Sequence, residues 1–438
     1  MKQAIYRLVI LTLAGMMLIG LLAGCGQAKE PAATSVPPTP RPTDLILPPT
    51  ALPPTPTDLI LPPTALPPTP TDLILPPTAS PVPGGASTGG ADEQQADLDR
   101  KIEEYTKAIT LDPQDAQAYY NRGLAYSYKG DLEQAIADYG QAIALDPQFA
   151  EAYNNRGNAY RDKGDPDRAI ADYDQAIALD PQLANAYNNR GTAYNDKGAL
   201  DRAIADYDQA IALDPTYADA YYNRGNAYAD KGDPDRAIAD YDQAIALDPN
   251  DAGAYYNRAT VYYEKGNLGQ AIADLDQAIT LNPQLAEAYL YRGYAYAGKG
   301  DLDLAIADFD QAIALGPQNA EAYYSRGTAY VAKGNLDHAI ADWGRAIALN
   351  PQHVRAYFNF NRALAYAQTG QFDQALADLS KVIEIDPRYA TAFCLRGQVY
   401  AQLGDREKAI SDLERALDLG LAPDTKAKAE ALLDELGH

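Results

Sequence analysis

Few residues in this chain have the side-chain chemistry of a catalytic or metal-binding site. The 438 residues include three histidines, His338, His353 and His438, and two cysteines, Cys25 and Cys394. The histidines are too few and too widely spaced to supply a set of metal ligands. Cys394 has no histidine placed to activate it as a nucleophile. Neither a phosphate-binding glycine loop nor a G-x-S-x-G turn occurs. We therefore expect no enzymatic activity, no metal ion and no cofactor.

Arginine and aspartate recur at a fixed spacing, and side chains of these two types form ion pairs. Each of nine repeating segments carries arginine at one fixed position and aspartate 16 residues later. A planar guanidinium suits a bidentate, partly buried contact with a carboxylate. We predict structural pairs within each helix hairpin or to the next one. An arginine row that binds anions is the disfavoured alternative, because each arginine has an acid to match. The arginines are Arg122, Arg156, Arg190, Arg224, Arg258, Arg292, Arg326, Arg362 and Arg396, and the aspartates are Asp138, Asp172, Asp206, Asp240, Asp274, Asp308, Asp342, Asp378 and Asp412.

The elements that position these side chains repeat every 34 residues. The period is marked by Pro113, Pro147, Pro181, Pro215, Pro249, Pro283, Pro317 and Pro351, and then slips to 36 residues for Pro387 and Pro423. A fixed period of this length indicates a stacked array of small units. In the unit that starts at residue 116, one helix is predicted from Gln117 to Lys129, with Gly130 at its end. A second helix is predicted from the N-cap Asp131 to Leu145.

Small and aromatic residues occupy fixed places in both helices. The first helix carries glycine or alanine at the place of Gly123 and tyrosine at the place of Tyr126. The first small position of the second helix is always an alanine equivalent to Ala135. This pattern resembles the tetratricopeptide repeat, a 34-residue helix–turn–helix. The usual tryptophan and leucine of the first helix are here tyrosine and arginine. The resemblance implies an all-α fold, a right-handed superhelical solenoid of antiparallel helix pairs. Nine units are expected in residues 116–423, with capping helices in residues 92–115 and 424–438.

In this family the first helices line a concave face, and extended peptides commonly bind there. Carried over by position, the inward residues are Asn121, Asn155, Asn158, Asn189, Asn223, Asn226 and Asn257, together with Asp162, Asp196 and Asp230. A row of carboxamides can both donate to and accept from a peptide main chain. The other interpretation is that these asparagines only satisfy a helix or bind water. From Leu290 and Tyr291 onward, through Phe358 and Phe360, the inward positions become apolar, which suggests a partner surface with a polar and an apolar half.

The N-terminus has the pattern of a secretory signal followed by a spacer. Lys2 and Arg7 precede an apolar stretch, and the segment Leu22-Ala23-Gly24-Cys25 resembles the lipobox of bacterial lipoproteins. This resemblance implies removal of residues 1–24 and acylation of Cys25, hence a lipid-anchored location in the envelope, outside the cytoplasm. The alternative is an uncleaved helix with an incidental cysteine. Residues 25–91 are rich in proline, threonine and glycine, which predicts a disordered linker of largely polyproline type.

The formal net charge of −24 argues against nucleic acid as a partner. We therefore expect a membrane-anchored, non-enzymatic scaffold or adaptor that binds a protein or extended peptide, polar or basic in character. Two other functions remain open, an assembly factor for an outer-membrane or pilus complex and a self-associating structural spacer. The sequence does not define the oligomeric state.

Overall fold

The computed structural model describes residues 88–349 and 356–437, with side chains from residue 95 onward. The predicted signal peptide, Cys25 and the linker up to residue 87 lie outside this part of the chain. The described residues contain helices and connecting turns, and no strand. Among them, none of the helices is long and apolar enough to cross a membrane. The predicted all-α class, built from antiparallel helix pairs, is confirmed.

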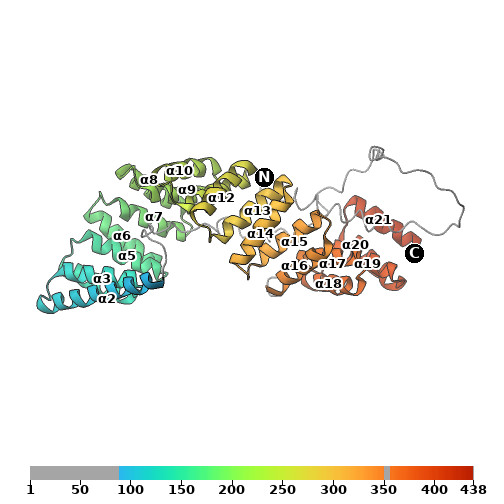
Figure 1. Ribbon diagram of the computed structural model, residues 1–438, viewed down its shortest axis with the longest axis horizontal. Helices are drawn as coiled ribbons and strands as arrows, with labels where there is room; N and C mark the ends of the chain where they lie inside the picture. Colours follow the sequence, from blue (N-terminus) through green and yellow to red (C-terminus); the bar gives the residue numbers. More distant parts are fainter. Residues whose placement is uncertain (1–87, 350–355, 438) are drawn as a thin grey trace. The chain divides into compact units, whose positions relative to one another are not determined.

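The described chain divides into two compact units, and the residues of α12 (Leu268–Leu281) are shared between them. Within each unit the helices follow one another in chain order (Figure 1). The N-terminal unit contains α2 (Thr88–Leu111), α3 (Ala116–Lys129), α4 (Leu132–Leu145), α5 (Ala150–Asp162), α6 (Pro166–Leu179), α7 (Ala184–Asp196), α8 (Leu200–Leu213), α9 (Ala218–Lys231), α10 (Pro234–Leu247) and α11 (Ala252–Glu264). The C-terminal unit contains α13 (Ala286–Lys299), α14 (Leu302–Leu315), α15 (Ala320–Ala332), α16 (Leu336–Leu349), α17 (Ala356–Gln368), α18 (Phe372–Ile385), α19 (Ala390–Gln402), α20 (Arg406–Leu419) and α21 (Pro423–Glu435).

The turns between paired helices follow the local sequence signals. Gly130 ends α3 with φ +83°, in the left-handed region that favours glycine. Before α6, the carboxylate of Asp165 accepts a hydrogen bond from the backbone N–H of Arg168, and Pro166 occupies the first turn. We call the first helix of each pair the A helix and the second the B helix.

Glycine and tyrosine determine how closely the two helices of a pair approach. A Cβ atom added to Gly157 on α5 would lie 2.7 Å from Cε1 of Tyr173 on α6. The tyrosine ring is fully buried and occupies the space that the glycine leaves. Ala169, at the start of the same B helix, is also fully buried. The core of this pair is therefore a small residue facing a large ring, as close packing requires. In α19 and α20 the equivalent Gly397 faces Leu413 instead of a ring.

Polar helices cover the ends of the array. In α2, Lys101 and Glu104 stand where α4 has the buried residues Ala135 and Asp138, and both are exposed. A long charged side chain in place of the alanine prevents another helix from packing closely there. At the other end, α21 packs on α20 through the buried residue Ala429 and related apolar side chains. Helix α2 begins at Thr88, four residues before the start at Asp92 that the sequence predicted.

Candidate interaction groove

The arginine and aspartate that recur in every unit meet across the helix pair. Arg190 donates from Nε to Oδ2 of Asp206 at 2.8 Å and from Nη2 to Oδ1 at 2.6 Å. The side chains of Arg190 and Asp206 are only 19% and 10% exposed. Hydrogen bonding to Asp206 raises the pKa of Arg190 further above its ordinary value. The same geometry joins Arg122 to Asp138, Arg156 to Asp172, Arg224 to Asp240, Arg292 to Asp308, Arg326 to Asp342, Arg362 to Asp378 and Arg396 to Asp412.

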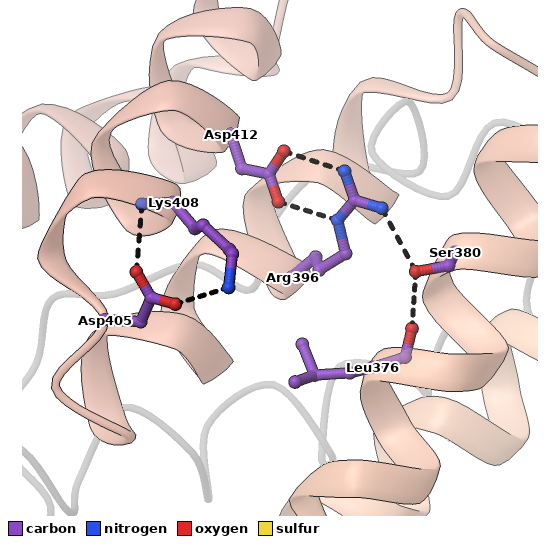
Figure 2. Close-up of polar contacts among 6 residues, drawn as sticks. All are labelled: Leu376, Ser380, Arg396, Asp405, Lys408 and Asp412. Atoms are coloured by element: carbon purple, nitrogen blue, oxygen red, sulfur yellow. Dashed lines mark hydrogen bonds and ion pairs between the residues drawn. The ribbon is translucent and has the colours of Figure 1, made fainter.

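Several of these arginines also contact the preceding unit, through acids that we did not single out from the sequence. Nη1 of Arg190 donates to Oδ1 of Asp174 at 2.6 Å, and equivalent bonds join Arg224 to Asp208, Arg258 to Asp242 and Arg326 to Asp310. Figure 2 shows the variant at Arg396, where the acceptor is the Ser380 hydroxyl at 3.1 Å. We call this third contact the inter-unit clip. Both arrangements considered from the sequence, within a hairpin and between hairpins, therefore occur, with different acids.

The asparagine row predicted for peptide binding forms hydrogen bonds between successive A helices. Nδ2 of Asn155 donates to the hydroxyl of Tyr120 at 2.8 Å, and Nδ2 of Asn189 donates to Oδ1 of Asn154 at 3.1 Å. Each bond joins residues 35 positions apart, so each such rung connects an A helix to the preceding one. The amides hold neighbouring units in register, which a repeat array needs because each unit contacts only its neighbours.

Three of the predicted groove residues are buried inside the array. Asn223, Asn226 and Asn257 are 5%, 6% and 2% exposed. Asn223 donates to Asn188, and Asn257 donates to Asn226 and to Tyr222. These contacts satisfy the hydrogen-bonding groups of the amides within the protein. They therefore support a structural role for the three buried asparagines and not peptide binding. Asn121, Asn155, Asn158 and Asn189 keep part of their surface in solvent.

The predicted apolar half of the partner surface is part of the core. Leu290 and Tyr291 are 5% and 8% exposed, and Phe358 and Phe360 are 6% and 4% exposed. Phe358 stacks on Tyr324, with the ring centroids 4.3 Å apart. The apolar side chains were expected to face a partner, but they fill the space between helices of the array.

A second row, closer to the C-terminal ends of the A helices, stays accessible. It consists of Asp162 on α5, Asp196 on α7 and Asp230 on α9, preceded at the same position of α3 by Tyr128, which is 80% exposed. We call these four residues the acidic strip. Sequence reasoning missed Tyr128, although alignment of the units places it in the row.

Charges on the strip act on one another and on the tyrosines beneath. Nη2 of Arg161 donates to Oδ1 of Asp162 at 3.2 Å. Asp196 has an exposed edge, but partial burial raises the pKa of its carboxyl. The charge of nearby Arg161 lowers this pKa, and the charge of Asp162 raises it. The pKa of Tyr173 is raised mainly by burial, and Asp162 and Asp196 contribute. The strip thus carries more negative than positive charge, in a partly desolvated setting.

The described residues include His338, Cys394 and many carboxylates. No group of three or more histidine, cysteine, aspartate or glutamate side chains among them is arranged to hold a metal ion. Cys394 is buried, and burial raises the pKa of its thiol to about 12, which keeps it protonated at neutral pH.

Comparison with known families agrees with the repeat pattern. Profiles described as "TPR repeat" and "Tetratricopeptide repeat" match residues 104–251, 256–353 and 363–419, more than half of the chain. The chain therefore belongs to the tetratricopeptide repeat (TPR) family. Proteins built from this repeat are typically interaction scaffolds. A search of curated proteins gives no match.

Several solved structures are similar to parts of the chain. MamA is 31% identical, covers 37% of this chain and 95% of its own, and has a TM-score of 0.36. YrrB, described as a TPR protein with an unusual peptide-binding site, is 28% identical over 45% of this chain and 97% of its own, with a TM-score of 0.38. PilF of Pseudomonas aeruginosa is 23% identical, covers 47% of this chain and 94% of its own, and has a TM-score of 0.44.

Proposed function

We propose that this protein is a non-enzymatic TPR scaffold that binds an extended, basic protein segment along the acidic strip. The observation that carries the proposal is the strip itself: Tyr128, Asp162, Asp196 and Asp230 occupy one position in four successive A helices. Repetition at one position suits an extended ligand, because the same contact recurs at each unit.

The chemistry of the strip favours lysine or arginine in the partner. The strip carries three carboxylates, and Arg161 pairs with one of them, Asp162. The exposed ring of Tyr128 offers a face to a cation, a contact of about 0.5–1 kcal/mol at a solvent-exposed site. The net charge of −24 further accelerates the approach of a basic partner.

The asparagines that keep an accessible surface contribute main-chain contacts in this proposal. Asn155 and Asn189 each use one amide N–H in a rung between units. A carboxamide has two N–H donors and an oxygen acceptor, so each can also bond a peptide backbone passing beside the strip. Such contacts would be independent of the partner's side chains, while the carboxylates select for positive charge.

Binding of a fluorescently labelled lysine-rich peptide, followed by anisotropy, tests the proposal. We expect the triple variant Asp162→Asn, Asp196→Asn and Asp230→Asn to bind at least about tenfold more weakly, corresponding to about 1.4 kcal/mol. The matched control changes three exposed acids outside the strip, Asp337→Asn, Glu407→Gln and Asp424→Asn. Equal loss of binding in both variants would show that total charge, and not the strip, attracts the peptide.

We also propose that Cys25 is acylated and anchors the scaffold to an envelope membrane, outside the cytoplasm, with residues 26–91 as the spacer. The support is the sequence pattern alone, since this segment lies outside the described residues. Several acyl chains on one cysteine would give durable attachment. Metabolic labelling with a palmitate analogue should mark the wild-type chain and not Cys25→Ser. Equal labelling of both would refute the anchor.

A further inference from the structure

Helix α17 departs from the packing rule that the other A helices obey. Four residues before the recurrent arginine, the eight other A helices carry alanine, and three residues before it they carry an aromatic ring. In α17 these places are taken by Phe358 and Asn359. The alanines are Ala118, Ala152, Ala186, Ala220, Ala254, Ala288, Ala322 and Ala392, and the rings belong to Tyr119, Tyr153, Tyr187, Tyr221, Tyr255, Tyr289, Tyr323 and Phe393.

The substitution removes an arginine–ring contact and leaves a buried polar group unsatisfied. In the eight other A helices the arginine lies over that ring, 5.5–5.7 Å from its centroid. Asn359 offers Arg362 no such ring. Asn359 is only 3% exposed, and its buried Nδ2 has no hydrogen-bond partner. A buried, unsatisfied amide costs about 1–3 kcal/mol.

The sequence of α17 contains the missing residues two positions earlier. Residues 356–362 read AYFNFNR, in which the dipeptide FN occurs twice. If the start of the helix moved by two residues toward Arg362, Ala356 would enter the alanine place and Tyr357 the ring place. The extra dipeptide would then form a local bulge. The observed register is correct close to the arginine, because Nδ2 of Asn361 donates to the hydroxyl of Tyr324 at 2.8 Å, as in the other rungs.

The boundary between α16 and α17 also lacks the inter-unit clip. The residue that faces Nη1 of Arg362 from the preceding unit is Gly344, whose missing Cβ would lie 3.3 Å from that nitrogen. At the equivalent place, Asp310 bonds to Arg326 one unit earlier and Ser380 bonds to Arg396 one unit later. This defect is independent of the one in α17, yet both affect the same boundary.

We propose that the boundary between α16 and α17 is a conformational joint, at which the start of α17 exchanges between the observed register and one shifted by two residues. The exchange opens the contact of α17 with α15 and α16 at a lower free energy than other boundaries within the C-terminal unit. The two arrangements bury similar side chains, so neither has the advantage that fixes register elsewhere in the array.

The single tryptophan reports directly on this joint. Trp343 on α16 is 1% exposed, and its Nε1 donates to the backbone oxygen of Tyr324 at 3.1 Å. In the full chain we expect acrylamide to quench Trp343 in mild urea, at concentrations where far-UV circular dichroism is unchanged. Coincident fluorescence and dichroism transitions in the wild type would overturn the proposal.

Two repairs with opposite geometry complete the test. Phe358→Ala with Asn359→Tyr restores the usual residues in the observed register, whereas deletion of residues 358 and 359 restores the 34-residue period. Each change should move the Trp343 transition to higher urea, so that it coincides with dichroism, and reduce quenching at least about threefold. Gly344→Asp should act in the same direction, with Gly344→Asn as its uncharged control. The proposal is refuted if neither repair shifts the Trp343 transition. If the deletion variant fails to fold, the double substitution Phe358→Ala with Asn359→Tyr still tests the proposal.

Discussion

Replacing Arg190 by leucine removes three hydrogen bonds, two within the helix pair α7 and α8 and one to the preceding unit. Two of them satisfy the buried carboxylate of Asp206, and the third is the clip to Asp174. Breaking a buried ion pair costs about 3–5 kcal/mol, and the partial exposure of Arg190 favours the lower end. The clip is more exposed and adds less than about 1 kcal/mol. We therefore expect Arg190→Leu to cost about 3–4 kcal/mol.

Native-state hydrogen exchange measures this cost locally at the site. A local measurement is needed because the global unfolding of a repeat array is not two-state. Amides in α7 and α8 should lose more than about a hundredfold in protection. Adding Asp206→Leu should restore most of it, because two leucines bury apolar surface without an unpaired charge. Arg156→Leu is the matched comparison, since Gly140 provides no clip to Arg156. Unchanged protection in Arg190→Leu, or additive losses in the double variant, would refute the structural role of the pair.

Three further changes test the packing and charges of the N-terminal unit. Gly140→Asp should supply the missing clip to Arg156 and also remove a helical glycine. We expect the two effects together to raise the free energy of unfolding by about 0.5–1 kcal/mol, measured as a shift of the urea midpoint. The control Gly140→Asn gains only from the removal of the glycine. Gly157→Ala should cost about 1–3 kcal/mol in thermal unfolding, because its Cβ overlaps the Tyr173 ring; a neutral result would contradict the close approach. Burial raises the pKa of Asp251, so its ionised form is disfavoured in the folded state; Asp251→Asn keeps the N-cap and should stabilise the protein at neutral pH, with the gain vanishing as the pH falls below the ordinary carboxyl range. A pH-independent difference would contradict this cause.

The repeat made the fold predictable because local signals and packing signals coincide in every unit. Gly130 and Pro166 mark helix ends, and a glycine facing a tyrosine, as in Gly157 and Tyr173, fixes the approach of the pair. The glycine that ends the A helix occurs nine times, so a chance match at one unit has no influence. The pairing of arginine with aspartate followed from the same periodicity, although the sequence did not distinguish the two possible geometries.

The candidate site was less predictable because a position in a repeat does not determine its exposure. Asn155 and Asn223 occupy equivalent positions, yet the first is half-buried and the second is buried. The difference depends on the neighbouring units, which supply Tyr120 in one case and Asn188 in the other. Likewise, the apolar residue Leu290 was expected to face a partner but packs between helices. The exposure of a residue depends on its own unit and on the two neighbouring units, so it does not follow from the sequence of a single unit.

The end helices bear on the alternative of a self-associating spacer. Charged Lys101 and Glu104 occupy places that would have to be small or paired if another unit stacked on α2. Head-to-tail stacking at this end would desolvate both charges, which is unfavourable without partners. This arrangement agrees better with a scaffold that binds other proteins than with a filament.

The most direct test of the scaffold proposal places a photo-crosslinking amino acid in the chain and illuminates intact cells that express it. At the position of Asp196 on the strip, illumination should yield a specific adduct with a partner segment rich in lysine or arginine, and free lysine-rich peptide should compete. The control position is Gln175, exposed on α6 and outside the strip. Adducts of equal yield and identity from both positions, or a partner segment without basic residues, would contradict the account.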